Sequence, residues 1–285
     1  MGILYVVGTP IGNLEDMTFR AIRTLRSVDV IAAEDTRHTG KLLQHFEVKT
    51  PQVSYHEHNR RERLPELLNQ LNQGKAIALV TDAGMPGISD PGYELVKACI
   101  EAGIQVVPIP GATAGITALS AAGLPTDRFV FEGFLPEKGK ERQKRLESLQ
   151  AEVRTLILYE SPHNLRVTLR DLANCLGNER RIVLARELTK LYEEFWRGTI
   201  SEAIAHYTQV EPKGEFTLVV AGVPIEDKPV LSDQELKVEL QQIMAQGISR
   251  SQASRQLAQL TQLPRRRLYE LALTLPGFSP TAMEE

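Results

Sequence analysis

The feature that most constrains the fold of this 285-residue chain is a regular alternation in its N-terminal half. Short runs rich in Val and Ile alternate with stretches whose apolar residues recur at helical spacing. These runs lack strict polar–apolar alternation, which is typical of strands buried on both faces. They are Ile3–Val7, Val28–Ala33, Ala76–Val80 and Gln105–Pro108. The pattern predicts an α/β layout with a mainly parallel sheet and helices over 18–26, 37–46, 60–73, 93–102 and 113–122.

A second α/β block follows a group of chain-breaking residues. Gly133, Pro136 and Gly139 interrupt the pattern and mark a boundary. Strand-like and helix-like stretches then alternate again. Within this block, Ser161 followed by Pro162 fits a helix N-cap with proline at the first helical position, which predicts a helix over 162–176.

The C-terminal part changes character and reads as helical. Ser232 with Glu235, and Ser249 with Gln252, fit capping boxes. Helices over 233–245, 250–261 and 265–274 have the spacing of a helix-turn-helix unit. We therefore predict three parts, with an N-terminal α/β subdomain at 1–133, a second at 134–227 and a small helical domain at 228–285.

The charge balance excludes a general polycation, because 33 Lys and Arg stand against 36 Asp and Glu for a net charge of -3. A nucleic-acid site must therefore come from the arrangement of charge. Cys99 and Cys175 have no neighbouring cysteines, so we expect reduced thiols in a cytoplasmic protein. The N-terminus has no basic stretch before a long apolar run, and we expect neither a secretory signal nor a membrane anchor.

Three glycine-rich loops follow predicted strands. They are GTPIGNL (8–14), TDAGMPGISDPG (81–92) and PGATAG (110–115). Glycine allows backbone to approach a ligand closely at the carboxyl ends of parallel strands, where α/β proteins assemble their sites. The sequence thus favours a ligand site at this edge. Asp82 either accepts hydrogen bonds from a ribose or amino group there, or caps a turn.

Several other classes of site are not favoured. Neither GxGxxG nor GxxxxGK[ST] occurs, so the dinucleotide fingerprint and the P-loop are unsupported. The serine-hydrolase motif GxSxG does not occur either. His56 and His58 form a pair without a third metal ligand nearby. We therefore expect chemistry without a metal.

The helical tail carries a concentrated basic patch. Five arginines and no acid occur between Ala245 and Tyr269, while the rest of the chain is acidic. Such a local arrangement is typical of phosphate binding, and we predict that it contacts RNA. A solvated helix face is the alternative, although such faces usually interleave acids. The arginines are Arg250, Arg255, Arg265, Arg266 and Arg267.

Together these motifs resemble the tetrapyrrole-methylase superfamily, the class III S-adenosylmethionine-dependent methyltransferases. Within it, the similarity is greatest to the branch that methylates small-subunit ribosomal RNA. The resemblance covers nearly the whole chain. It rests on GTPIGNLEDMTFRA (8–21), AEDTRHTGKLL (33–43), SYHEHN (54–59), TDAGMPGISDPG (81–92), PIPGATA (108–114), FEGFLP (131–136), YESPH (159–163), RELTKLYEE (186–194) and RRRLYELAL (265–273).

The resemblance implies two α/β subdomains with S-adenosyl-L-methionine in the cleft between them, and usually a homodimer. It implies methylation of the ribose 2′-hydroxyl of a cytidine in the decoding region of 16S rRNA, within the assembling ribosomal subunit. Donor contacts of the family fall on Pro10, Val80, Thr81, Asp82, Ile88, Thr113, Ala114, Tyr159 and Leu188.

A ribose hydroxyl is a weak nucleophile, so in-line methyl transfer from a sulfonium calls for a positioned base. A buried Lys190 would have a lowered pKa and could accept the proton. Each candidate could instead fix a loop, and the sequence leaves the choice open. The candidates are Glu34, Asp35, Glu160, Lys190 and Glu193.

Two other functions compete with this interpretation. A methyltransferase acting on a small tetrapyrrole would share the donor site, but it would have no need of an arginine-rich helical tail. A DNA-binding regulator would use the tail as a helix-turn-helix. Against a regulator stands the long α/β region with its several ligand loops.

Overall fold

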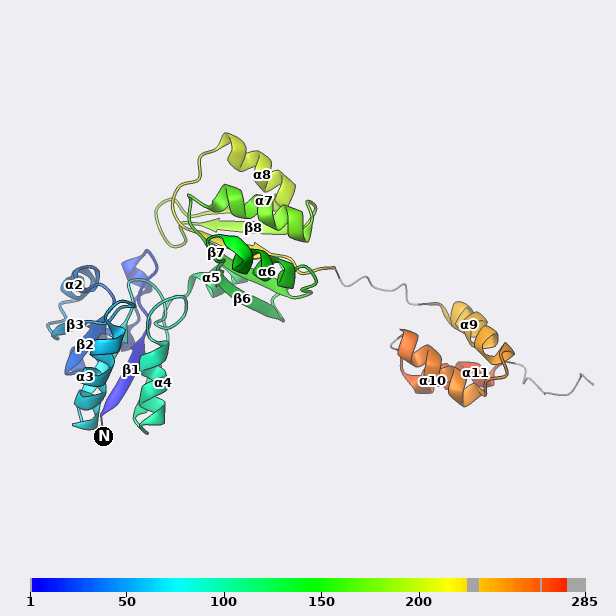
Figure 1. Cartoon of the computed structure of the whole chain (residues 1–285), viewed down its shortest axis with the longest axis horizontal. Coiled ribbons are helices and arrows are strands. Elements are labelled where there is room, and N and C mark those ends of the chain that lie inside the picture. Colours follow the sequence, from blue (N-terminus) through cyan, green and yellow to red (C-terminus); the bar gives the residue numbers. More distant parts are fainter. Residues whose placement is uncertain (1, 225–230, 262, 276–285) are drawn as a thin grey trace, which may run out of the picture. The chain divides into compact units, whose positions relative to one another are not determined.

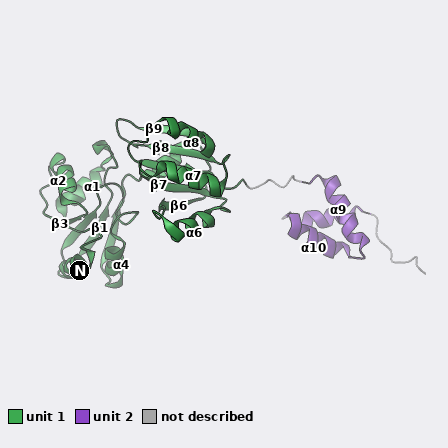
Figure 2. Cartoon of the chain, turned by 45° about the horizontal axis from the view of Figure 1, so that its top comes forward, with its two compact units in different colours: residues 1–224 green, residues 225–285 purple. Residues whose placement is uncertain are grey.

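The computed structural model describes residues 2–224, 231–261 and 263–275, which belong to two compact units. The first unit is Met1–Pro224 and the second is Ile225–Glu285 (Figure 2). The first unit contains two β-sheets with their helices, whereas the described part of the second contains helices alone (Figure 1). The unit boundary lies close to residue 228, where the sequence predicts the helical tail to begin.

The first sheet is entirely parallel, as the alternation of the sequence predicts. Its strand order is β3-β2-β4-β1-β5. The predicted strands are confirmed. The structure adds the short β3, which the sequence did not predict because Gln-Val-Ser contains no apolar run. The bounds are β1 Ile3–Val7, β2 Val30–Ala33, β3 Gln52–Ser54, β4 Ala76–Val80 and β5 Gln105–Ile109.

Helices cover both faces of this sheet, which explains why its central strands are apolar throughout. Ile31 and Ala33 of β2 pack on one face with α1 (Phe19–Ser27) and α2 (Thr36–His45). Alternate residues of the same strand, Val30 and Ala32, pack on the other face. The helices on that face are α3 (Arg60–Asn72) and α4 (Tyr93–Glu101). A single-turn 3-10 helix, η1 (Leu14–Asp16), precedes α1.

The second sheet is mixed. Its strand order is β6-β7-β10-β8-β9, in which only β6 and β7 are parallel. The bounds are β6 Phe129–Phe134, β7 Thr155–Glu160, β8 Arg181–Arg186, β9 Glu194–Thr199 and β10 Phe216–Val220. Because β10 is antiparallel to β7 and β8, its first residues lie beside the last residues of those strands.

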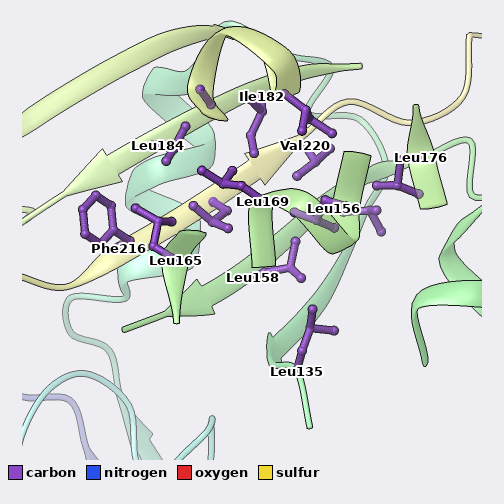
Figure 3. Packing of buried hydrophobic residues seen from close by; sticks show 14 of the residues in the cluster. Leu135, Leu156, Leu158, Leu165, Leu169, Leu176, Ile182, Leu184, Phe216 and Val220 are labelled. Atoms are coloured by element: carbon purple, nitrogen blue, oxygen red, sulfur yellow. The ribbon is translucent and has the colours of Figure 1, made fainter. Parts of the chain in front are cut away.

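One face of the second sheet carries a large leucine-rich core (Figure 3). Leu165, Leu169 and Leu176 project from α7 (Leu165–Leu176) at intervals that keep them on one helical face. They meet Leu156, Leu158, Ile182 and Leu184 of the strands. The helices α6 (Gly139–Leu149) and α8 (Ile200–Gln209) complete this layer.

The opposite face of the second sheet is covered by α5 (Ala114–Ala122). Ala118 and Leu119 of α5 pack against Ile157, Val183 and Val219. The helix that follows the last strand of the first sheet thus belongs to the core of the second. Because this helix begins at the end of the loop at 110–115, it connects the two halves of the first unit next to that loop in the chain.

The predicted boundary at residues 133–134 falls inside β6, which pairs with β7 in the second sheet. The pairing register shifts between Phe131 and Gly133, and Gly133 has a φ of 62°. The glycine that suggests a linker in the sequence is therefore a bulge within a strand, which is a common role for glycine there.

The predicted start of α7 also differs from the structure. Ser161 is not the N-cap, because the helix begins at Leu165 after Asn164. The carbonyl of Ser161 accepts hydrogen bonds from the N–H groups of Asn164 and Leu165, at 3.3 and 3.1 Å. Residues 161–164 thus form a turn that precedes the helix and leaves Ser161 and Pro162 at the end of β7.

The second unit has the three predicted helices, α9 (Asp233–Ala245), α10 (Arg250–Thr261) and α11 (Arg265–Leu273). The Ser232–Glu235 capping box is present. Ser249 and Gln252 exchange hydrogen bonds as expected. Leu240, Leu257 and Leu268 lie in a common core. No helix among the described residues of the whole chain is long and apolar enough to cross a membrane.

Candidate active site

A cavity of about 440 Å³ lies in the first unit, at the carboxyl ends of β1, β4, β5, β7 and β8. Both sheets contribute to its wall. The mixture of apolar, hydroxyl and carboxylate groups is typical of a small-molecule site. The lining residues are Ile11, Ala83, Gly84, Met85, Ile88, Ser89, Asp90, Thr113, Ala114, Phe134, Tyr159, Glu160, Ser161, Pro162, Ala185, Leu188, Glu215, Phe216 and Thr217.

The three glycine-rich loops meet at this cavity through direct backbone contacts. The N–H of Thr9 donates to the carbonyl of Gly84 at 2.9 Å, and the N–H of Gly84 donates to the carbonyl of Thr9 at 3.2 Å. A Cβ on Gly8 would lie 2.7 Å from backbone atoms of Gly111. These two glycines are needed because no side chain fits between the first and third loops.

Five of the nine predicted donor-binding residues line the cavity: Ile88, Thr113, Ala114, Tyr159 and Leu188. The other four do not. Pro10, Val80 and Thr81 are buried and Asp82 is half-buried. The structure therefore brings together predicted residues from the segments after β4, β5 and β8 with Tyr159 near the end of β7.

Tyr159 fixes one wall of the cavity. Its hydroxyl accepts a hydrogen bond from the N–H of Gly115 at 3.1 Å, which ties the end of β7 to the first turn of α5. Its ring meets Phe131 and Phe134 edge-on, with ring centroids 5.1 and 5.6 Å apart. Burial raises the pKa of the Tyr159 hydroxyl, so it stays neutral.

Asp82 lies behind the wall in a group of carboxylates. One of its oxygens accepts a hydrogen bond from the N–H of Asp35 at 3.2 Å. Glu34 accepts a hydrogen bond from the hydroxyl of Thr81 and another from the N–H of Asp82. Burial, with Glu34 nearby, raises the pKa of Asp82. This group joins the ends of β2 and β4.

Lys190 does not fit the expected role of a neutral base. Its Nζ lies 2.8 Å from Oε1 of Glu187 and 2.8 Å from Oε2 of Glu215. Burial alone would lower the pKa of Lys190, but hydrogen bonds to the two carboxylates outweigh it and raise the pKa. The expectation of a lowered pKa is thus wrong, because the sequence did not reveal these two partners.

Like Glu34, the other three carboxylate candidates have evident structural roles. Asp35 caps α2 and pairs with Arg37, whose hydrogen bonds hold the pKa of Asp35 far below its usual range. Glu160 lines the cavity, but it accepts hydrogen bonds from the N–H of Ser161 and the hydroxyl of Thr168. Glu193 accepts a hydrogen bond from the N–H of Thr189 at 2.6 Å.

Several residues that line the cavity were not singled out as site residues from the sequence, among them Asp90, Phe134 and Glu215. Asp90 lies in the same loop as Asp82, so the composition of that loop contained the signal. Glu215 is the first residue before β10 and is brought to the cavity only by antiparallel pairing. No local motif marks such a position.

Metal ligands are not grouped in the part of the chain that the structure describes, where no three or more His, Cys, Asp or Glu residues are placed to hold an ion. His56 is used locally, since its Nδ1 accepts a hydrogen bond from the N–H of Asn59 at 3.2 Å. Cys99 is buried, Cys175 is half-buried and both are free thiols.

The arginines of the second unit differ in how they are used. Arg250 is half-buried and donates to the carbonyl of Leu275 at 2.7 Å, which ties α10 to the end of α11. Arg255, Arg265, Arg266 and Arg267 are exposed. Arg266 pairs with Glu270 and Arg267 with Asp233, at 3.1 and 2.9 Å. Exposed pairs of this kind are weak and can be exchanged for other anions.

The chain matches the family model of tetrapyrrole (corrin/porphyrin) methylases over residues 3–204. Several similar proteins are named ribosomal RNA small subunit methyltransferase I. The one from Synechocystis sp. is 64% identical over 96% of this chain and 99% of its own length. Those from Halalkalibacterium halodurans and Bacillus subtilis are 51% and 48% identical, each over 95% of this chain and 94% of the relative.

Solved structures of lower identity share the fold. The uroporphyrin-III-C-methyltransferase of Thermus thermophilus is 24% identical, has a TM-score of 0.56 and covers 78% of this chain and 94% of that one. The methyltransferase CobJ is 21% identical, has a TM-score of 0.58 and covers 78% and 95% of the two chains. The predicted pair of α/β sheets is thereby confirmed as this fold.

Proposed function

Because the chain belongs to the tetrapyrrole methylase family and is a methyltransferase that uses S-adenosylmethionine, we propose that its acceptor is small-subunit ribosomal RNA. The proposed reaction transfers a methyl group to the ribose 2′-hydroxyl of a cytidine in the decoding region of 16S rRNA. The single observation that carries the proposal is the match to relatives of that name over nearly their whole length.

The cavity suits S-adenosylmethionine in size and in chemistry. Its volume is about 440 Å³, within the range of small-molecule sites. Ile88 and Leu188 offer apolar surface for a purine, while Thr113 supplies a hydroxyl and the adjoining loops supply backbone groups. When bound, S-adenosylmethionine supplies an electrophilic methyl group on a positively charged sulfur. The carboxylates near the wall favour that charge.

The residues around the cavity fix its shape and limit access of water. Tyr159 ties the second sheet to α5, and the contacts between Thr9 and Gly84 tie the first loop to the second. Phe134 and Ile88 are large apolar side chains that line the cavity and remain more than half exposed, at 59% and 51%. They are placed to cover bound reactants. Such a rigid enclosure aligns the reacting atoms for in-line displacement.

The helical unit supports an RNA acceptor. A small-molecule methyltransferase has no need of a separate unit with exposed arginines on α10 and α11. We infer that Arg255, Arg265, Arg266 and Arg267 contact phosphates, whereas Arg250 holds the unit together through Leu275. We also propose a cytoplasmic homodimer that acts on the assembling ribosomal subunit.

The test of the acceptor compares methyl incorporation from labelled donor into immature small ribosomal subunits, free 16S rRNA and uroporphyrinogen. We expect label in the subunits, at a cytidine 2′-oxygen located by nuclease digestion and mass analysis. Label in uroporphyrinogen alone would overturn the proposal in favour of a small-molecule methyltransferase. Light scattering of the same preparation tests the homodimer.

The role of the tail is tested by replacing Arg265, Arg266 and Arg267 with Ala. Each lost phosphate contact should lower the slope of log affinity against log salt by about 0.7–0.9. Replacement of the same three residues by Lys is the matched control, because it keeps the charge. Normal methylation of subunits by the Ala variant in moderate salt would exclude an RNA contact here.

A further inference from the structure

The proposed function requires a group that removes the proton of the ribose hydroxyl, and the inference below rests on that function. Three carboxylates line the cavity: Asp90, Glu160 and Glu215. The carboxylate of Glu160 already accepts hydrogen bonds from Ser161 and Thr168, and Glu215 is paired with Lys190. Asp90 is joined to no cation by an ion pair among the described residues.

The loop holds Asp90 in a defined position. The N–H of Gly87 donates to the carbonyl of Pro91 at 3.2 Å and closes a tight turn around it. Ser89 has a φ of 62°, which a residue with a side chain rarely adopts. Backbone strain of this kind persists only where the surrounding structure enforces it, and it gathers at functional sites. The strain falls on the residue directly before Asp90.

The second sheet also positions this loop. A Cβ on Gly133 would lie 2.9 Å from Oγ of Ser89, so the loop after β4 lies directly against the bulge in β6. Asp90 and Tyr159 face the same cavity from the two sheets and influence each other electrostatically. Asp90 therefore belongs to the wall on which both halves of the first unit converge.

The charges around Asp90 suit a group that takes up a proton near neutral pH. Burial, with the negative charges of Glu34 and Asp82, raises its pKa from 3.8 to about 6, while the hydroxyl of Thr81 opposes the shift. A general base works best when its pKa lies near the operating pH. The titratable or polar groups that face it are Glu34 directly after β2, Thr81 and Asp82 from the loop after β4, and Tyr159 from β7.

We propose that Asp90 is the general base of the methyl transfer. Its carboxylate accepts the proton of the ribose 2′-hydroxyl as the oxygen forms its bond to the methyl carbon. The bond from that carbon to sulfur breaks, and the sulfur keeps the electron pair and becomes a neutral thioether. The products are a 2′-methyl ether, the thioether and a protonated Asp90, which then releases its proton to water.

The first test is Asp90→Asn, which keeps the size of the side chain and removes the basic group. Single-turnover methylation of the subunit at saturating donor should fall by about 10²-fold or more. Donor affinity, measured by calorimetry, should change little. Asp127→Asn is the matched control, because it makes the same chemical change at an exposed aspartate that does not line the cavity, and it should keep the rate within a small factor of the original.

Other results for Asp90→Asn would overturn the proposal. A rate that returns at high donor concentration would make Asp90 a donor contact. A raised KM for the subunit with an unchanged maximal rate would make it an acceptor contact. An unchanged rate would place the base elsewhere.

The second test uses the pH dependence of kcat/KM, which reports the free protein. Because the base must be deprotonated, the rate should rise with pH, with an apparent pKa near 6, and level off above it. Glu34→Gln removes one of the charges that raise this pKa, so the rising limb should move to lower pH. If Glu34 were itself the base, the same substitution would abolish the limb and most of the rate.

Failure of this proposal is distinguishable from failure of the proposed function. If the unaltered protein binds S-adenosylmethionine but methylates no small subunit, the acceptor is wrong. If it methylates subunits and Asp90→Asn does so equally well with the same pH profile, only the assignment of the base is wrong.

Discussion

Two loops border the cavity, and they hold their charged side chains in opposite ways. The loop after β4 gathers Asp82 and Asp90 near Glu34, and no ion pair in the described structure joins these three carboxylates to a cation. The loop after β8 places Lys190 between Glu187 and Glu215, at 2.8 Å from each. The carboxylates at the loop after β4 thus lie near other negative charges, whereas the charges at the loop after β8 are paired with opposite ones.

The difference shows in the direction of the pKa shifts. In the first loop, burial and neighbouring negative charge raise the pKa of Asp82 and Asp90. In the second loop, burial opposes the shifts, but hydrogen bonds still lower the pKa of Glu187 and raise that of Lys190. The first loop is therefore suited to exchange a proton, whereas the second keeps its charges and its shape.

Both loops also contain strained backbone, which shows that strain alone does not identify the base. Ser89 has a φ of 62° in the first loop, and Glu187 and Thr189 have φ values of 50° and 66° in the second. The difference in charge between the two loops is what assigns the base to the loop after β4. The following predictions test the contrast, beginning with the packing that brings the loops together.

The largest effect is expected from Gly8→Ala. Its new Cβ would lie 2.7 Å from the backbone of Gly111 and 2.6 Å from Sδ of Met85, so the first and third loops must separate. We expect a loss of about 1–3 kcal/mol in the free energy of unfolding, measured by thermal denaturation, together with loss of donor binding. An Ala variant that binds the donor normally would show that the loops do not form the site by close contact.

Gly40→Ala is the matched control for this substitution. Gly40 lies within α2, and its nearest neighbour for an added Cβ is 3.6 Å away, an ordinary contact. Alanine has the higher helix propensity, so stability should stay equal or rise slightly.

The next largest effect is expected from Asp82→Ala. One oxygen of Asp82 accepts a hydrogen bond from the N–H of Asp35, and the other accepts none from described residues. If that oxygen holds the donor, its removal should weaken donor binding by about 1.5–3 kcal/mol in calorimetry. An unchanged dissociation constant would leave Asp82 as the organiser of the turn between β2 and β4.

The sequence predicted the glycine loops and the sheet around them, because each lies in a local pattern of strand, loop and helix. It did not predict which charges pair. Glu215 reaches Lys190 only through the antiparallel placement of β10. The boundary at residue 133 failed for a related reason, since Gly133 forms a bulge inside β6, a role that local composition cannot distinguish from a linker.

The third prediction concerns Asp90→Asn, which should raise the free energy of unfolding, whereas Gly8→Ala should lower it. The pKa of Asp90 is about 6 in the folded chain, above its ordinary value of 3.8. Between these pH values the folded chain holds a proton that the unfolded chain has released, so the contribution of Asp90 to stability falls as pH rises. Asp90→Asn should therefore stabilise the protein at pH 8 by about 1–2 kcal/mol, since the half-exposed carboxylate keeps part of its hydration.

At pH 3.5 most of the gain from Asp90→Asn should disappear, because the folded chain and most of the unfolded chain then hold the proton. Denaturant unfolding of the variant and the original protein at both pH values measures the difference. A variant that is less stable than the original at pH 8 would contradict the unfavourable charge inferred for this loop.

The smallest effect is expected from Lys190→Met in the second loop. The side chain of Lys190 is 29% exposed and that of Glu215 is 80% exposed, so the ion pairs are partly screened by water. Loss of the pairs should cost about 1 kcal/mol of unfolding free energy at pH 7. The pKa of Glu187 is lowered in the folded chain, so its share of this stability is present above its ordinary pKa and lost as pH falls. The cost should therefore shrink in acid, and Glu215→Gln, which removes only the exposed partner, should cost less.

Methyl transfer by Lys190→Met should fall by less than about 10-fold with the same rising pH limb, because a paired Lys190 shapes the loop without exchanging a proton. A loss of 10²-fold or more, with the limb abolished, would give the role of base to Lys190 and reverse the contrast between the two loops.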